Sequence, residues 1–265
     1  MPNIKLTIAY DGTRYAGMQW QRGHATIQSE LERALAELTG EPVRVTASGR
    51  TDSGVHALAQ VVNFVTKNDL AVDVYPRALN AALPDDIAVL DAELMPDDFH
   101  SILAARRKRY RYVLHDAPQR DVFLHNHAWR VRRKLDTTKM NDAAQLFVGT
   151  HDFAGFQGSG SRRLSTTRTV FEAAITRPHA DQPHVIYFEV EAEGFLYNMV
   201  RVMIGSLVDV GRGVAEPSWI SELLEHGDRK RAGMTAPAHG LFLMRVDYES
   251  ECDPDKRLTR PSRAP

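Results

Sequence analysis

Hydrophobic and polar residues alternate along the first half of the chain in segments that predict strands and helices in turn. Residues 4–10 alternate with period two, which is typical of a strand with one buried face. Residues 27–38 place apolar side chains at helical spacing, with Thr26 as a candidate N-cap and Gly40 as the end of the helix. The other elements expected here are a strand beginning at Val43, a strand over residues 60–65, a helix ending near Leu83 and a strand over residues 87–90.

The second half of the chain repeats this order of elements. Residues 110–115 alternate as a strand, and residues 136–148 have helical spacing. The remaining elements expected are a strand over residues 185–192, a long apolar helix over residues 195–211 and a strand over residues 240–248.

This order predicts an α+β fold of two ferredoxin-like halves that share a mixed, mostly antiparallel sheet around a basic cleft. The N-terminal half takes residues 1–104 and the C-terminal half residues 105–248. No linker rich in proline or glycine separates them, so we expect one continuous sheet. Residues 157–165 are expected to form a mobile basic loop, and residues 249–265 a disordered tail.

The composition indicates a chain that folds without a membrane or disulfides. The chain has 265 residues, of which 43% are hydrophobic, enough to bury a sizeable core. No run approaches about eighteen apolar residues, and the N-terminus has no signal-peptide pattern, so we expect a cytoplasmic protein with no membrane partner. Cys252 is the single cysteine, which leaves neither a disulfide framework nor a cysteine-ligated zinc site.

Basic residues are concentrated in three runs, although the formal net charge is −1. The runs cover residues 106–112, 129–134 and 161–168, and aromatic residues such as Tyr110 and Trp129 lie within them. A single charge run is typical of a solvated face. Three runs that combine arginine with aromatic side chains favour nucleic acid, because aromatics stack on bases and arginine contacts phosphate.

A short polar loop, SGRTDSGVHA, covers residues 48–57. Two glycines among serine, threonine and aspartate indicate a tight turn between a strand and the next element, a position where catalytic groups are often held. Asp52 is the only acid in this loop. The alternative is an Asx turn, in which Asp52 accepts hydrogen bonds from its own backbone and has no chemical role.

Arg201 is the oddity of the long apolar helix, because it lies within residues 195–210, where nearly every face is hydrophobic. A guanidinium buried without a partner would cost several kcal/mol, so Arg201 needs a carboxylate. Asp52 is the best candidate, since glycines allow its loop a close approach. The alternatives are an ion pair with another acid, or a side chain that reaches the surface.

With Arg50 beside it and Arg201 as its expected partner, Asp52 is predicted to be ionised at neutral pH. An ionised carboxylate suits a nucleophile or a general base, and does not suit a general acid. The histidine-containing segments have no convincing metal-ligand spacing, and the sequence contains no phosphate-binding or dinucleotide-binding glycine motif. We therefore expect neither a metal nor a cofactor.

The segment GRTDSGVHA resembles the signature loop of tRNA pseudouridine synthases of the A family. Further segments occur in the order that the family shows. IAYDGTRYAG precedes this loop, and Phe99-His100 with RRKRYRY, then FLYNMVR, then GLFLMRVDY come after it. The resemblance covers residues 4–248. It implies the pseudouridine synthase fold, which agrees with the two halves predicted above.

The resemblance also assigns roles to individual residues. It implies that Asp52 is the catalytic aspartate, Arg50 the arginine beside it, Tyr110 the active-site tyrosine and Arg201 the arginine that pairs with the aspartate. Leu241 corresponds to a leucine that lines the pocket. The pairing of Arg201 with Asp52 also followed from the polarity of the helix, so the two arguments support each other.

Further residues are expected at the RNA, and three positions depart from the family pattern. Arg14 and Arg109 are expected to bind the substrate. Ser53 stands where alanine is common, Met18 where an aromatic residue is common, and Ile102 where arginine is frequent. The change at Ile102 puts a phosphate contact there in doubt, unless neighbouring basic residues supply it.

The resemblance implies an isomerase that converts uridine to pseudouridine at nucleotides 38, 39 and 40 of the tRNA anticodon stem-loop, as a homodimer and without a cofactor. Asp52 could attack C1′, add to C6 or take a proton from C2′, and the sequence does not choose among them. Tyr110 is expected to stack on the flipped uracil. The alternatives are a non-catalytic RNA-binding protein of the same fold and a metal-dependent nuclease or hydrolase that uses the histidines.

Overall fold

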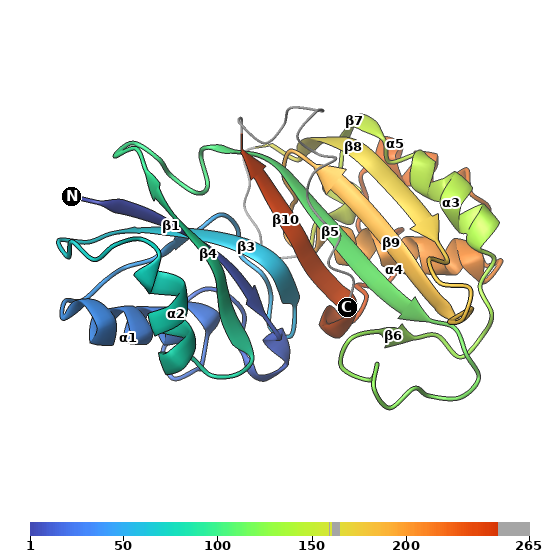
Figure 1. Ribbon diagram of the computed structural model, residues 1–265. Helices are drawn as coiled ribbons and strands as arrows, with labels where there is room; N and C mark the ends of the chain where they lie inside the picture. The colour runs from blue at the N-terminus through green and yellow to red at the C-terminus, as the bar shows by residue number, and fades with distance from the viewer. Residues whose placement is uncertain (159, 161–164, 249–265) are drawn as a thin grey trace.

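The computed structural model describes residues 1–158, 160 and 165–248. Their strands form one sheet in the order β4-β1-β3-β10-β5-β9-β8-β7, with β2 beside β3 and β6 beside β5 (Figure 1). The strands are β1 (Asn3–Tyr10), β2 (Thr46–Ala47), β3 (His56–Val65), β4 (Ile87–Met95), β5 (Ala105–His115), β6 (Trp129–Arg130), β7 (Gly149–Asp152), β8 (Thr167–Thr176), β9 (Val185–Ala192) and β10 (Leu241–Tyr248). The helices are α1 (Ile27–Thr39), α2 (Val74–Ala82), α3 (Thr137–Gln145), α4 (Met199–Gly211) and α5 (Trp219–His226), with 3-10 turns η1 (Gly12–Arg14), η2 (Ala154–Phe156) and η3 (Ala238–Gly240).

The N-terminal half follows the predicted pattern closely. Thr26 caps α1 by accepting a hydrogen bond from the Ser29 N–H at 3.1 Å, and Gly40 ends the helix in the left-handed region at φ 74°. The strand expected from Val43 is shorter than predicted, because only β2 pairs with β3 there. Residues 157–165, where a mobile loop is expected, lie partly outside the described residues. Residues 249–265, where a disordered tail is expected, lie wholly outside them.

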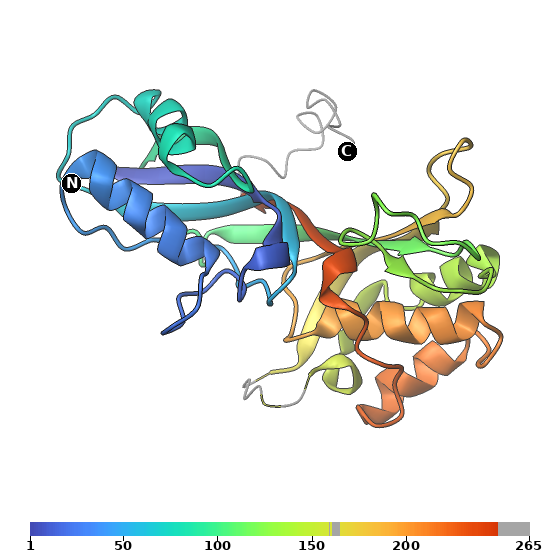
Figure 2. The same ribbon diagram turned by 90° about the horizontal axis from the view of Figure 1, so that it is seen from below.

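The C-terminal half differs from the prediction at the start of its long helix. α4 begins at Met199 and not at Phe195, because Asn198 has a left-handed backbone with φ 59° that interrupts the helix. α4 passes behind β5 and β9 in Figure 1, and Figure 2 shows α4 and α5 on one side of these strands. Nearly all residues of α4 are buried. The helix is apolar on every face because every face packs against the rest of the protein.

The two halves join through β10, which lies between β3 and β5. It runs parallel to β3, where Phe242 is paired with His56, and antiparallel to β5, where Leu243 is paired with Tyr110. The expectation of a continuous sheet is therefore confirmed. The junction places the loop before β3, the aromatic residues of β5 and the start of β10 side by side. Among the described residues, no helix has the length and apolar character needed to cross a membrane.

Candidate active site

The loop that carries Asp52 connects β2 to β3 and is a tight turn, as its glycines predict. The Val55 N–H donates to the Asp52 carbonyl at 3.1 Å, and Gly54 has φ 78°, which L side chains rarely adopt. Gly17 packs on this loop so closely that a Cβ there would lie 2.6 Å from the Thr51 carbonyl oxygen. The segment before α1 therefore supports the loop from one side.

Arg201 reaches Asp52 from the first turn of α4. Its Nη1 donates to Asp52 Oδ2 at 3.1 Å and to Asn198 Oδ1 at 2.8 Å, and its Nε donates to the Ala236 carbonyl at 2.7 Å. The Arg201 side chain is 17% exposed and the Asp52 side chain 30%. The ion pair predicted from the helix pattern is thus present, and its guanidinium is fixed by three acceptors.

Asn198 is a site residue that the sequence analysis missed. Its Oδ1 orients Arg201, and it is the one non-glycine residue with positive φ among the described residues. Asparagine tolerates the left-handed region better than other L residues do, so an asparagine just before an apolar helix was the available signal. A strained backbone beside the arginine that pairs with Asp52 fits a functional position.

Tyr110 lies on the same side of the sheet junction, 9% exposed and edge-on to Phe195 with ring centroids 5.1 Å apart. Burial raises the pKa of Tyr110 well above its usual value, and the nearby Tyr10 and Asp52 raise this pKa further. The hydroxyl therefore stays protonated at neutral pH, which favours stacking over proton removal. Leu241 is buried opposite Tyr112, two positions along β10 from the Leu243 that pairs with Tyr110.

Two of the predicted substrate-binding residues, Arg14 and Arg109, form ion pairs with acids other than Asp52, while Arg50 lies two residues before Asp52. Arg50 is an exposed residue of the loop. Arg14 forms an ion pair with Asp86 at 2.6 Å. Arg109 neighbours Tyr110 along β5 and so points to the opposite face of the sheet, where it pairs with Glu172 and Glu191.

Asp11, His56 and His127 form the one group of metal-ligand side chains with suitable spacing among the described residues. His56 Nδ1 lies 3.1 Å from the donating Gly12 N–H, and its Nε2 lies 3.0 Å from the Asn126 carbonyl. Burial lowers the pKa of His56, although the charge of Asp11 raises it in part. Since these ring nitrogens already have protein partners, the group fits a hydrogen-bonded cluster, and the absence of a metal stays a prediction.

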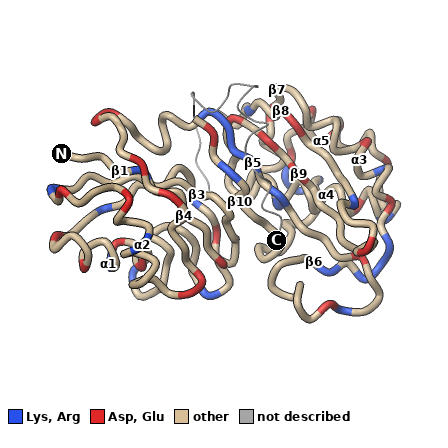
Figure 3. Tube along the Cα trace, in the orientation of Figure 1, with Lys and Arg blue, Asp and Glu red and all other residues tan. Residues whose placement is uncertain are grey.

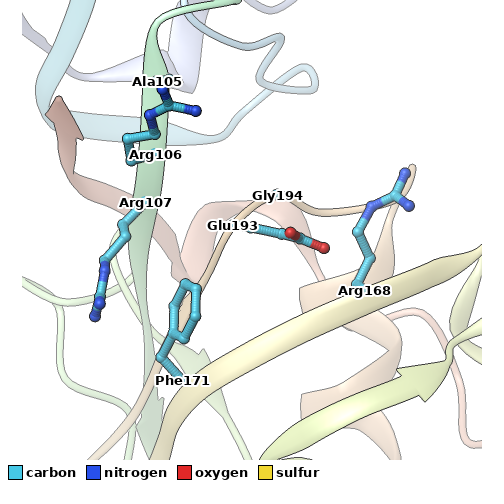
Figure 4. A pocket seen from close by; sticks show the side chains of 7 residues that line it. All are labelled: Ala105, Arg106, Arg107, Arg168, Phe171, Glu193 and Gly194. Atoms are coloured by element: carbon cyan, nitrogen blue, oxygen red, sulfur yellow. The ribbon is translucent and has the colours of Figure 1, made fainter. Parts of the chain in front are cut away.

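A basic cavity of about 790 Å³ lies at the start of β5. It is lined by Ala105, Arg106, Arg107, Arg168, Phe171, Glu193 and Gly194 (Figure 4). The Arg107 guanidinium lies over the Phe171 ring at 4.2 Å and pairs with Glu191. Figure 3 shows the basic residues gathered along the first half of β5. Gly194 directly precedes Phe195, the residue that meets Tyr110 edge to face.

Comparison with known proteins places this geometry in a family. A family model for tRNA pseudouridine synthase matches residues 6–103 and 143–249. The chain belongs to the tRNA pseudouridine synthase family. It is 48% identical over 248 residues to tRNA pseudouridine synthase A of Pelobacter propionicus, which covers 94% of this chain and 100% of that protein. It is also 43% identical over 248 residues to tRNA pseudouridine synthase A of Acetivibrio thermocellus, with the same shares of each chain covered.

Compared with a solved Cbf5-Nop10-Gar1 complex, the chain has a TM-score of 0.36 and 14% sequence identity, and the match covers 90% of this chain and 57% of that one. This comparison of folds adds nothing to the family assignment. Family membership confirms the predicted isomerisation of uridine to pseudouridine in tRNA. It does not favour the alternative of a non-catalytic RNA-binding protein.

The departures from the family pattern have different surroundings in this tRNA pseudouridine synthase. Met18 is 1% exposed, so it fills the core beneath the loop that carries Asp52. Ser53 Oγ donates to the Tyr15 carbonyl at 3.1 Å, a bond that alanine could not make. Ile102 is 49% exposed, and an arginine there would reach solvent.

Proposed function

We propose that the chain isomerises uridines 38, 39 and 40 of the tRNA anticodon stem-loop, with Asp52 as the reacting carboxylate. The observation that carries this proposal is the Asp52–Arg201 pair, at 3.1 Å, beside the protonated phenol of Tyr110. The three nucleotides follow from the resemblance of the sequence to the A family. Arg201, Tyr110 and Leu241 complete the proposed site, and Arg50 contacts the RNA from the rim of the loop.

The reaction breaks the N1–C1′ bond of uridine and forms a C5–C1′ bond in its place. The proton on C5 leaves, N1 gains a proton, and no electron is gained or lost overall. Asp52 is the group that attacks C1′, adds to C6 or removes a proton from C2′, while Arg201 fixes the direction of the carboxylate. Tyr110 and Phe195, which meet edge to face, offer an apolar wall for the flipped uracil.

A uridine in a stem must leave its stack before Asp52 reaches it, and this costs a few kcal/mol that contacts elsewhere offset. The cavity at the start of β5, which Arg106 and Arg168 help to line, is suited to phosphates of the same RNA. Contacts of this kind read backbone and shape more than base edges. They are therefore compatible with an enzyme that accepts three adjacent nucleotides.

The same resemblance leads us to propose a cytoplasmic homodimer in which one tRNA touches both subunits. Light scattering on a size-exclusion column, with and without tRNA, tests the assembly. A mass of one chain at micromolar concentration in both conditions would contradict it. Fractionation of the native cells tests the compartment.

The isomerase activity is tested by tritium release from tRNA transcripts labelled at C5 of uridine, with the wild type and Asp52→Asn at saturating RNA. We expect release by the wild type and none by the variant, with tRNA binding retained by both. Asp98→Asn, which changes an exposed acid, is the matched control and should behave as wild type. Transcripts with a single uridine at 38, 39 or 40 test each nucleotide. Binding by the wild type without release from any tRNA would instead support an RNA-binding protein of the same fold.

A further inference from the structure

We propose that Gln60 is a positioning residue that holds the loop of Asp52 in its reactive geometry. This inference rests on the proposed role of Asp52. Gln60 lies in β3, paired with Ile8 of β1, and is 0% exposed. A buried carboxamide is costly unless its oxygen and nitrogen are both hydrogen-bonded, so its partners explain its presence.

Both ends of the Gln60 carboxamide bind the residues that lead into the loop. Its Oε1 accepts from Ser48 Oγ at 2.6 Å, and its Nε2 donates to the Gly49 carbonyl at 3.0 Å. Oε1 also accepts from the Val61 N–H at 3.1 Å. At this position β3 carries an amide in place of an apolar residue. The amide binds Ser48 and Gly49, the two residues that precede Arg50.

Two further side chains hold the same segment and extend the network. Lys108 Nζ donates to the Ser48 carbonyl at 2.7 Å from β5, the strand that carries Tyr110. The Tyr10 hydroxyl lies 2.8 Å from Thr51 Oγ1. Burial raises the pKa of Tyr10 to about 12, although the hydrogen bond with Thr51 lowers it in part, so this hydroxyl stays protonated.

The loop needs such support because it contains no regular secondary structure between β2 and β3. Gly49 and Gly54 add conformational freedom on both sides of Asp52. The carboxylate has to meet Arg201 and the substrate in one orientation, and a displacement of about 1 Å can reduce a rate by about a hundredfold. Gln60 removes that freedom at the start of the loop, and it acts on Asp52 through the backbone of Ser48 and Gly49.

The test compares Gln60→Met, which keeps the length and removes the hydrogen bonds, with Asn63→Leu. Asn63 is also a buried amide of β3, but it binds Asn3 and Ser101, away from the loop. We expect Gln60→Met to lower kcat about tenfold or more, with the tRNA Kd within about twofold of wild type. Asn63→Leu should lose stability but keep kcat within about twofold at a temperature where both variants are folded.

Two added measurements separate this inference from the proposed function. Hydrogen exchange of residues 48–55 in the free protein should speed up in Gln60→Met and not in Asn63→Leu, whatever the wild-type activity. Ser48→Ala combined with Gln60→Met should cost less than the sum of the two single changes. Unchanged kcat and unchanged loop exchange in Gln60→Met would overturn the positioning role. An inactive wild type with the expected exchange pattern would overturn only the assignment of the reaction.

Discussion

Arg201 Nη1 donates a hydrogen bond to Asp52 Oδ2 at 3.1 Å, between residues 149 positions apart in the sequence. The aspartate belongs to the N-terminal half and the arginine to the C-terminal half. β10 joins these halves in one sheet, and this sheet holds the loop of Asp52 and the helix of Arg201 next to each other. The candidate active site is therefore a product of the sheet junction and not of either half alone.

Replacing Arg201 should remove activity more than stability. Arg201→Met leaves Asp52 without its fixed partner, and we expect kcat/KM to fall at least about a hundredfold. Arg201→Lys should recover only part of this loss, because an ammonium lacks the planar fork that serves Asp52, Asn198 and Ala236 together. Tritium release under single-turnover conditions measures the effect.

Arg212→Met provides the matched control for that measurement. Arg212 ends α4 and lies 3.9 Å from Asp209, so its loss changes charge on the same helix without touching Asp52. We expect the control to keep kcat/KM within about twofold of wild type. Equal losses in the two variants would assign Arg201 a merely structural role.

Asn198 should show the cost of its left-handed backbone. Both Asn198→Ala and Asn198→Gly remove the acceptor for Arg201, but only glycine adopts φ 59° without strain. We expect the alanine variant to be less stable than the glycine variant by about 1 kcal/mol. Urea unfolding of the two proteins gives this difference directly. Equal stabilities would mean that the backbone relaxes when the asparagine is replaced.

Tyr110 should contribute no pH dependence to the reaction below pH 10, because burial raises its pKa well above the usual value. A base acts in its deprotonated form, so a reaction that used the Tyr110 phenolate would speed up about tenfold per pH unit in this range. We expect the single-turnover rate on bound tRNA to stay within about twofold from pH 7 to 9.5, in the wild type and in Tyr110→Phe. A steep rise in the wild type that is absent from Tyr110→Phe would make the tyrosine the base.

Much of the fold could be predicted from the sequence, because strong local patterns set it. Thr26 and Gly40 define α1 by capping chemistry that acts within one turn. The Asp52–Arg201 pair could also be predicted, since a charge in an apolar helix requires a partner. These signals are local, or involve a single unmatched charge.

The rest depends on tertiary context that periodicity does not record. The start of α4 was placed too early because residues 195–197 are hydrophobic like the helix itself, and the left-handed backbone of Asn198 separates them from it. β8 and α5 were not predicted. Arg109 was expected at the RNA, but it points to the opposite face from Tyr110, where its partners are acids on β8 and β9. Gln60 carried no signal at all, because its partners are set by how the loop folds back.

The cavity at the start of β5 should contribute to RNA affinity through phosphate contacts. Arg106→Gln and Arg168→Gln, which change two of its lining residues, should each weaken tRNA binding and reduce the slope of log K against log salt by about 1 (Figure 4). Arg77→Gln, at an exposed position of α2, is the control. Filter binding at salt concentrations from about 50 to about 300 mM measures these slopes. Slopes equal to wild type in both cavity variants would place the RNA elsewhere.

Asp11 should make the protein less stable in acid. Burial raises its pKa, but hydrogen bonds from Thr13 and His127 and the charge of His56 outweigh burial and lower the pKa to about 2, below the ordinary value of an aspartate. A carboxyl whose pKa is lower in the folded state stabilises the fold above its unfolded pKa and loses that contribution as the pH falls through the folded pKa. The advantage of wild type over Asp11→Asn should therefore shrink as the pH falls from about 4 to 2. Thermal unfolding of both proteins across this range measures it, and a Tm difference that does not change with pH would show that Asp11 contributes only through neutral contacts.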